Sequence, residues 1–270
     1  MTRETLTREK IVRTAVELLD EQGLAGLRMR NLGDRLGTAA TTMYWHIGSK
    51  DNLLVLASEA SWTEIPLPDL EKTAWRDCAA DMARGQYAML TRHPWLVQAM
   101  SSQVLYGPAK ARHDDHNLAV YELAGFAGAE ADRAAAIVFM FVLGSAFGAS
   151  ASAELDARLR RLGGDPRRRL RELVAHQKSI AMQFPRLRAR LETVDDGDYY
   201  GAPEKSFEMG LDDVLDGLGR QLAEDARRRD AGDAGDGRPG SLPSPAPSQH
   251  RVAASSASLQ SSSDQYRRIP

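Results

Sequence analysis

The sequence predicts an all-α protein. Apolar residues recur at the three- and four-residue spacing of helices along most of the chain. Gly and Pro interrupt them where helices would end, and no segment shows the alternating β-branched pattern of a strand. At 270 residues the chain is long enough for two ordinary domains. We expect a head at residues 1–65, a larger helical body at residues 66–229 and a tail at residues 230–270.

The first expected helix begins after Thr7, a residue type that caps helix N-termini, with Glu9 in its first turn. Gly23 is expected to stop it. Five apolar residues fall on one face: Ile11, Val12, Ala15, Leu18 and Leu19. This helix should form the base of the head, against which the helices that follow it pack.

Two short helices with one shared apolar seam are expected over about residues 28–47. Leu32 and Leu36 lie four apart on the first, Gly37 allows a sharp turn, and Met43 and Ile47 repeat the spacing on the second. A helix-turn-helix needs such a narrow apolar contact between its helices. The first helix must hold the second firmly, while most of the surface of the second faces the major groove. Four side chains are left for that surface: Thr41, Thr42, Tyr44 and His46.

A further helix follows Lys50 and ends before Pro66 and Pro68, whose missing donors force an extended path and mark the domain boundary. The body is expected to contain helices at residues 75–90, from 93 onward, and at 109–123, 130–162, 166–184 and 204–229. The tail, residues 230–270, is rich in Gly, Pro and Ser, so it cannot bury enough apolar surface to fold, and we predict disorder.

Charge and cysteine content restrict the class of protein. The net charge is −2, so binding to a polyanion would depend on a local surface. The single cysteine, Cys78, excludes an internal disulfide, and the polar N-terminus carries no secretory signal, so we expect a cytoplasmic protein. Residues 134–153 carry no charge and are about long enough to span a bilayer, but a buried helix at an interface is favoured, and no membrane partner is expected.

Residues from Leu6 to about Ala57 closely resemble the DNA-binding domain of the TetR (tetracycline repressor) family. The resemblance lies in the segments AVELLDEQG, LGDRLG and TTMYWHIGSKDNLL. It implies a homodimer whose two heads bind a pseudo-palindromic operator in double-stranded DNA, controlled by a ligand in the body. The function expected from it is a ligand-responsive transcriptional regulator, a repressor released by a small hydrophobic effector.

The resemblance also assigns roles to individual residues of the head. Arg30 and Thr41 are expected to contact bases, and Thr42 lies beside them on the reading surface. Three residues are expected at DNA phosphates: Tyr44, His46 and Lys50. Trp45 has two possible roles, packing within the head or touching DNA. Ala39 and Ala40 stand where the family often has longer polar side chains, so hydrogen-bonded readout should be sparse there.

The body carries further family-like segments, including RHPW at residues 92–95 and FEMGL at 207–211. In the family the last two helices pack against those of a second subunit as a four-helix bundle. The residues expected in this dimer interface are small or apolar: Gly144, Gly148, Leu211, Val214, Leu215 and Leu218. An ordinary core within one chain is the alternative for them.

A ligand pocket is expected between helices of the body, apolar with a few polar groups. Candidate lining residues are Met82, Gln86, Met89, Trp95, Met100, Gln103, Asn117, Tyr121, Phe139 and Phe147. Each of them is also a candidate core residue. Methionines and aromatics would suit a large, flat hydrophobic ligand such as a polyketide.

His113 and His116 lie three apart with two carboxylates between them, a spacing that metal sites use. No third ligand is identifiable, so an exposed polar helix start is favoured, and neither metal nor cofactor is expected. The chain lacks a GxSxG elbow, a P-loop, a dinucleotide fingerprint and an HExxH motif, so no catalytic residue is predicted. The alternative function is a ligand-independent architectural or recombinase-type DNA-binding protein.

Overall fold

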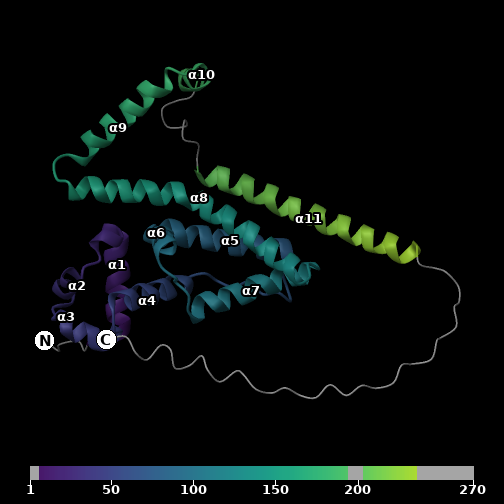
Figure 1. The fold of residues 1–270 in the computed structure, drawn as a ribbon, viewed down its shortest axis with the longest axis horizontal. Helices are drawn as coiled ribbons and strands as arrows, with labels where there is room; N and C mark the ends of the chain where they lie inside the picture. The colour runs from purple at the N-terminus through teal and green to yellow at the C-terminus, as the bar shows by residue number, and fades with distance from the viewer. Residues whose placement is uncertain (1–5, 194–202, 236–270) are drawn as a thin grey trace, which may run out of the picture. The chain divides into compact units, whose positions relative to one another are not determined.

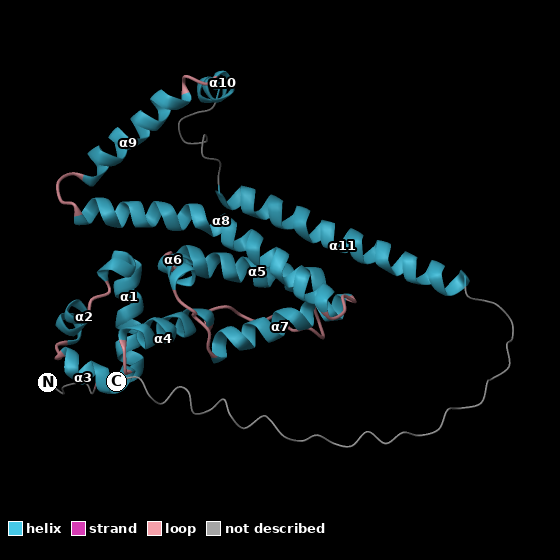
Figure 2. Cartoon of the chain, in the orientation of Figure 1, coloured by secondary structure: helices cyan, strands magenta, loops and turns pink. Residues whose placement is uncertain are grey.

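A computed structural model describes residues 6–193 and 203–235, and every element in that part of the chain is a helix (Figure 2). The predicted all-α class is confirmed. The described residues up to Arg227 form one compact unit, so head and body are packed together, and a second unit begins at Arg228. The boundary between head and body near residue 65 stays a prediction.

Four helices make up the head (Figure 1): α1 Arg8–Gly26, α2 Met29–Leu36, α3 Ala40–Ile47 and α4 Lys50–Trp62. Thr7 caps α1 as predicted, because its side-chain oxygen accepts a hydrogen bond from the backbone N–H of Lys10 at 3.2 Å. The backbone leaves helical geometry at Gly23, where φ is 67°, a conformation that glycine adopts without strain. One more turn then completes α1, so Gly23 makes a kink three residues before the end.

Glycines also set the spacing of α2 and α3. Gly37 ends α2 with a left-handed φ of 61°. Gly33 is buried, and a Cβ at this position would lie 2.7 Å from the carbonyl oxygen of Thr38. A larger residue would therefore push the turn away from α2. The N-terminus of α4 is capped by Ser49, whose hydroxyl oxygen accepts from the N–H of Asn52 at 3.0 Å.

Seven further helices follow: α5 Trp75–Arg92, α6 Trp95–Ser102, α7 Pro108–Ala124, α8 Ala129–Arg161, α9 Pro166–Ala181, α10 Pro185–Thr193 and α11 Pro203–Gly235. The expected helix at 166–184 ends at Ala181, and α10, which was not predicted, follows Pro185. Helix α11 continues to Gly235, six residues past the predicted start of the tail. The rest of the predicted tail, 236–270, lies outside the described residues.

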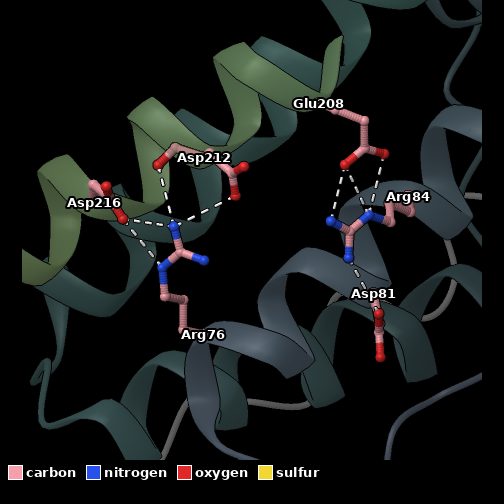
Figure 3. A network of polar contacts seen from close by, with 6 residues as sticks. All are labelled: Arg76, Asp81, Arg84, Glu208, Asp212 and Asp216. Carbon is pink, nitrogen blue, oxygen red and sulfur yellow. Dashed lines mark hydrogen bonds and ion pairs between the residues drawn. The ribbon is translucent and has the colours of Figure 1, made fainter. Parts of the chain in front are cut away.

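The start of α11 is held on α5 by rings and ions. The ring of Phe207 stacks on that of Tyr87 with centroids 4.0 Å apart. Figure 3 shows two arginines of α5 reaching across to carboxylates of α11: Arg76 donates to Asp216 at 2.5 Å, and Arg84 donates to Glu208 at 2.9 Å. These side chains are partly exposed, so the rings contribute most of the stabilisation and the ion pairs fix the register.

The long helix α8 contains the uncharged stretch that resembles a membrane span. Within the described residues it is the helix long and apolar enough to cross a bilayer, and one third of its most apolar window is buried. Helices α5, α6 and α7 pack against it. Packing against these helices in the core of the body therefore accounts for part of the apolar composition of α8.

Candidate functional site

The head places α3 at the surface by burying one side of it. Leu32 of α2 and Met43 of α3 are fully buried, and Ile47 is 1% exposed. They belong to the core that α1 and α4 also enter, and α2 packs directly on α3. The seam predicted from the spacing of these residues is therefore present, and it holds α3 as a helix-turn-helix requires.

The opposite side of α3 is open to solvent. Thr41 and Thr42 are exposed, and Tyr44 is 40% exposed. Trp45 is 90% exposed, so it does not pack within the head, and that interpretation is wrong. A fully solvated indole is unfavourable unless something covers it, which adds Trp45 to the candidate contact surface.

The other predicted DNA contacts lie near the ends of neighbouring helices. Arg30 is exposed in the first turn of α2, and Lys50 is exposed as the first residue of α4. His46 is half-buried near the end of α3, and its backbone carbonyl accepts a hydrogen bond from Arg8 at 2.9 Å. The structure thus brings α3, the N-terminus of α4 and Arg8 of α1 together in the head.

A buried histidine joins the head to the body. Nδ1 of His93 lies 2.7 Å from a carboxylate oxygen of Asp20 on α1, and Nε2 lies 3.1 Å from one of Glu64, just after α4. Trp95 donates its indole N–H to the same oxygen of Asp20 at 2.9 Å, and Arg92 donates to Glu64 at 2.7 Å. Burial lowers the pKa of His93, but the two carboxylates outweigh this and raise it above its usual value.

Helix α4 is tied to the body at two more places. The carboxylate of Glu59 accepts hydrogen bonds from the backbone N–H groups of Ala109 at 2.6 Å and Lys110 at 3.3 Å, so a residue of α4 caps the N-terminus of α7. The amide of Gln103 donates to Asp51 in the first turn of α4 at 3.4 Å. The position of α4 is therefore set by the body as much as by the head.

The predicted ligand residues divide among four places. Met82, Gln86 and Met89 lie in the buried face of α5. Trp95 and Gln103 are engaged in the contacts with the head described above. Half-buried Met100 and exposed Phe147 line a hollow of about 630 Å³ between α6 and α8. The remaining three lie on α7 and α8: Asn117 is half-buried, Tyr121 is fully buried and Phe139 is half-buried.

The two histidines of the HDDH segment differ in surroundings. His113 is 2% exposed and its ring lies 4.9 Å from that of Trp62, so the expectation of an exposed helix start is wrong for this residue. His116 places Nε2 2.9 Å from the carbonyl oxygen of Pro68. Among the described residues no group of three or more His, Cys, Asp or Glu is placed to hold a metal ion.

The residues predicted for a dimer interface separate into two sets. Gly144 and Gly148 are exposed on α8, and a Cβ added to either would meet no atom within 4 Å. On α11, Leu211 and Leu215 are fully buried, Leu218 is 5% exposed and Val214 is half-buried. These α11 side chains belong to the core of their own chain, as the alternative expectation had it. A stripe of exposed side chains on α8 is left uncovered: Ile137, Met140 and Phe147.

Two family models match this architecture. The model of bacterial regulatory proteins of the tetR family matches residues 11–57, and the tetracyclin repressor-like C-terminal domain matches residues 67–222. The chain belongs to the TetR family. The matches agree with the head and body described above, and they make the chain a member of a family of transcriptional regulators.

Individual TetR proteins are similar over much of this chain. An HTH-type transcriptional regulator of Saccharopolyspora erythraea is 39% identical over 144 residues, which are 53% of this chain and 61% of that protein. The tetracycline repressor protein class C of Escherichia coli is 30% identical over 79% of this chain and 90% of its own length. The crystal structure of Streptomyces coelicolor ActR in complex with actinorhodin has a TM-score of 0.58 and 26% identity, covering 80% of this chain and 96% of that one.

The surroundings of three residues of this TetR protein could not be assigned from the sequence, although contact with DNA was one of the two expected roles of Trp45. An exposed Trp45 and a buried His113 reverse the usual preference of each residue type, so hydropathy gives no signal for either. The role of His93 depends on Asp20 and Glu64, which lie 73 and 29 residues away in the sequence. The segment RHPW drew attention to this place as a family mark, but its partners could not be identified from the sequence.

Proposed function

We propose that the chain is a ligand-responsive repressor of the bacterial cytoplasm, which binds a pseudo-palindromic operator as a homodimer and is released by a small hydrophobic effector. The observation that carries the proposal is the surface of α3, where Thr41, Thr42, Tyr44 and Trp45 are exposed while Met43 is fully buried. A short helix held from behind with such a face fits the major groove.

Each predicted contact has a part in this proposal. Arg30 and Thr41 contact base edges, with Thr42 beside them, and Trp45 gives apolar contact. Tyr44, His46 and Lys50 contact phosphates, which fix the position of the head on the duplex. Lys50 is suited to this because it also lies at the N-terminus of α4, where the helix dipole favours an anion.

The homodimer is supported by the exposed stripe on α8. Ile137, Met140 and Phe147 are 48%, 64% and 64% exposed, an uncommon concentration of large apolar side chains on one helix. Gly144 and Gly148 lie between and beside them with open space around their Cα atoms, so the helix of a second copy can approach closely. Two heads in one assembly double the phosphate contacts and read two half-sites.

The proposed effector enters the body. ActR, which shares the fold over most of this chain, binds actinorhodin in its crystal structure, and this supports an aromatic natural product as the class of ligand here. Helix α4 carries the signal in the proposal, because Glu59 and Asp51 attach it to α7 and to Gln103 before α7. A ligand that moves these contacts changes the swing of the head and lowers DNA affinity without touching the reading surface.

The decisive experiment measures binding of the full chain to DNA from upstream of its own gene by fluorescence anisotropy over a range of salt. We expect a sequence-selective complex whose affinity falls steeply with salt. Lys50→Ala should reduce the slope of log K against log salt by about 2 for a dimer, because each phosphate that the protein no longer neutralises accounts for about 0.9. Lys72→Ala is the control, since this exposed lysine of the body pairs with Asp69.

Two outcomes contradict the proposal. One is the absence of a salt-sensitive, sequence-selective complex, which removes the regulator function. The other is an equal decrease of the slope in Lys50→Ala and Lys72→Ala, because that would mean general electrostatic attraction instead of a docked head.

A further inference from the structure

The C-terminal end of α3 is bonded by side chains from two other helices of the head. The last carbonyl groups of a helix have no partner inside the helix. In α3 the carbonyl oxygen of His46 accepts a hydrogen bond from Nε of Arg8 at 2.9 Å, and that of Ile47 accepts one from the side-chain amide of Asn52 at 2.7 Å. Arg8 is the first residue of α1, and Asn52 lies in the first turn of α4. Two neighbouring helices therefore hold the same end of α3.

The N-terminal end of α3 lacks a side-chain cap. Its N-cap residue is Ala39, whose methyl group cannot accept a hydrogen bond from the backbone. By contrast, Thr7 caps α1 and Ser49 caps α4 through their hydroxyl oxygens. Of these three helices, α3 therefore has the weakest N-terminal cap. Its orientation depends correspondingly more on the bonds at its C-terminal end.

Apolar packing alone determines the tilt of α3 only weakly. Met43 and Ile47 anchor the helix through contacts that are non-directional, whereas a hydrogen bond weakens steeply when its angle changes. Thr41 lies six residues before Ile47, which is about 9 Å along a helix. A tilt of about 5° at the C-terminal end would move Thr41 by about 0.8 Å. Hydrogen bonds to base edges tolerate only a few tenths of an ångström, so such a tilt removes base readout.

The proposed phosphate contact of Lys50 depends much less on the tilt of α3, because Lys50 is the first residue of α4. The start of α4 is fixed by its own cap, in which the backbone N–H of Asn52 donates to the hydroxyl oxygen of Ser49 at 3.0 Å. Replacing the side chain of Asn52 leaves that backbone bond in place. Loss of the bonds at the end of α3 should therefore reduce the preference for one DNA sequence and leave the salt-dependent attraction to phosphates unchanged.

We propose that Arg8 and Asn52 are positioning residues, which set the sequence selectivity of the head by fixing the direction of α3 without reading a base themselves. This inference rests on the proposed regulator function, and it deepens that function by naming two residues on which selectivity depends. Arg8 suits its place further because the helix dipole stabilises a cation at a helix C-terminus. Asn52 is neutral, so its replacement tests the bond without changing the charge of the head.

The test measures binding of the full chain to two DNA duplexes by fluorescence anisotropy over a range of salt. One duplex is DNA from upstream of its own gene, the other a scrambled duplex of the same length and composition, and selectivity is the ratio of the two affinities. Asn52→Ala removes the donor to Ile47, and alanine favours the helix, so folding is preserved. We expect its selectivity to fall about tenfold with an unchanged slope of log K against log salt. Arg8→Lys keeps the charge but lacks the Nε–H, and it should also lower selectivity at an unchanged slope.

Asn31→Ala is the matched control. The side-chain amide of Asn31 donates to the carbonyl oxygen of Gly26 at 3.1 Å, so it makes the same kind of bond at the end of α1 instead of α3. Both asparagines lie in helices of the head and both become alanine, so the two variants should show similar shifts of the urea unfolding midpoint. Asn31→Ala should keep the selectivity of the wild type, because the end of α3 stays bonded.

Three results would overturn the inference: wild-type selectivity in Asn52→Ala, an equal loss of selectivity in Asn31→Ala, or a salt slope in Asn52→Ala that falls as much as in Lys50→Ala. The first means that the bond has no effect on reading, the second that any loss of stability in the head weakens reading, and the third that Asn52 serves a phosphate contact. Each of them leaves the regulator function standing, provided that the wild type prefers its own upstream DNA. A wild type that does not distinguish the two duplexes refutes the regulator function itself, and the inference with it.

Discussion

Replacing His93 with Gln is expected to weaken the junction between head and body. The substitution removes two charge-assisted hydrogen bonds, at 2.7 Å to Asp20 and 3.1 Å to Glu64. Such bonds contribute about 1.5–3 kcal/mol each when buried. The carboxylates are 29% and 34% exposed and keep other donors, so each bond lies at the low end of that range. We expect the free energy of unfolding to fall by about 2–3 kcal/mol at acidic pH.

The effect should depend on pH, with a sign set by the raised pKa of His93. A group whose pKa is higher in the folded state stabilises the fold fully below its unfolded pKa, about 6.5 for histidine. That contribution disappears as the pH rises through the folded pKa. The difference in stability between wild type and His93→Gln should therefore be largest near pH 5.5 and should shrink on going to pH 8.5.

Urea unfolding at fixed protein concentration, repeated between pH 5.5 and 8.5, measures this difference. His116→Gln is the control, because that imidazole bonds the carbonyl oxygen of Pro68 instead of carboxylates. A difference for His93→Gln that stays constant with pH, or grows as the pH rises, would refute the argument that a protonated imidazole holds Asp20 and Glu64 together.

Three further predictions concern the head and the dimer. Trp45→Ala should change the free energy of unfolding by less than about 0.5 kcal/mol, because this side chain is 90% exposed. It should weaken operator binding measured by fluorescence anisotropy. Normal DNA affinity would exclude Trp45 from the interface. Gly144→Leu should leave monomer folding intact, because a Cβ at this position meets no atom within 4 Å. It should shift sedimentation towards monomer, since the proposed dimer brings a second copy against this position. An unchanged dimer would place the interface elsewhere. Leu32→Ala should lower the free energy of unfolding in a denaturant titration by about 2–5 kcal/mol, because Leu32 is fully buried. A decrease under about 1 kcal/mol would mean that the head is loosely packed.

The head could be predicted almost residue by residue because its determinants are local. The cap at Thr7, the break at Gly23 and the turn at Gly37 each follow from the preference of one residue type. The seam of Leu32 and Met43 follows from helical spacing. Tertiary packing adds little that contradicts these preferences in so small a unit.

The packing of α11 could not be predicted, because an apolar stripe has the same sequence pattern whether it packs on its own chain or on a second one. Leu211 and Leu215, predicted at a dimer interface, lie in the core of the monomer. The contacts that decide this are remote in sequence: Arg76 meets Asp216 across 140 residues, and Arg84 meets Glu208 across 124. Helical periodicity carries no information on such pairs.

The burial of His113 escapes prediction for a related reason. The segment HDDH at residues 113–116 is predicted to be solvated, because four polar residues in succession are mostly exposed in proteins. In the helix His113 faces inward beside Trp62, whereas Asp115 is exposed. The burial of Tyr121 on the same helix, by contrast, could be predicted from its apolar ring.

Helix α4 links the two halves of the proposed mechanism through its length. Its 13 residues span about 20 Å, with Lys50 at one end and Trp62 at the other. A tilt of about 5° produced at the Trp62 end would move the Lys50 end by about 1.7 Å over that length. Hydrogen bonds to phosphate have a tolerance of only a few tenths of an ångström around about 2.9 Å, so such a tilt breaks the bond. An effector that displaces the Trp62 end of α4 therefore needs no path through α3 to release DNA, because the other end of the same helix carries Lys50, the proposed phosphate contact.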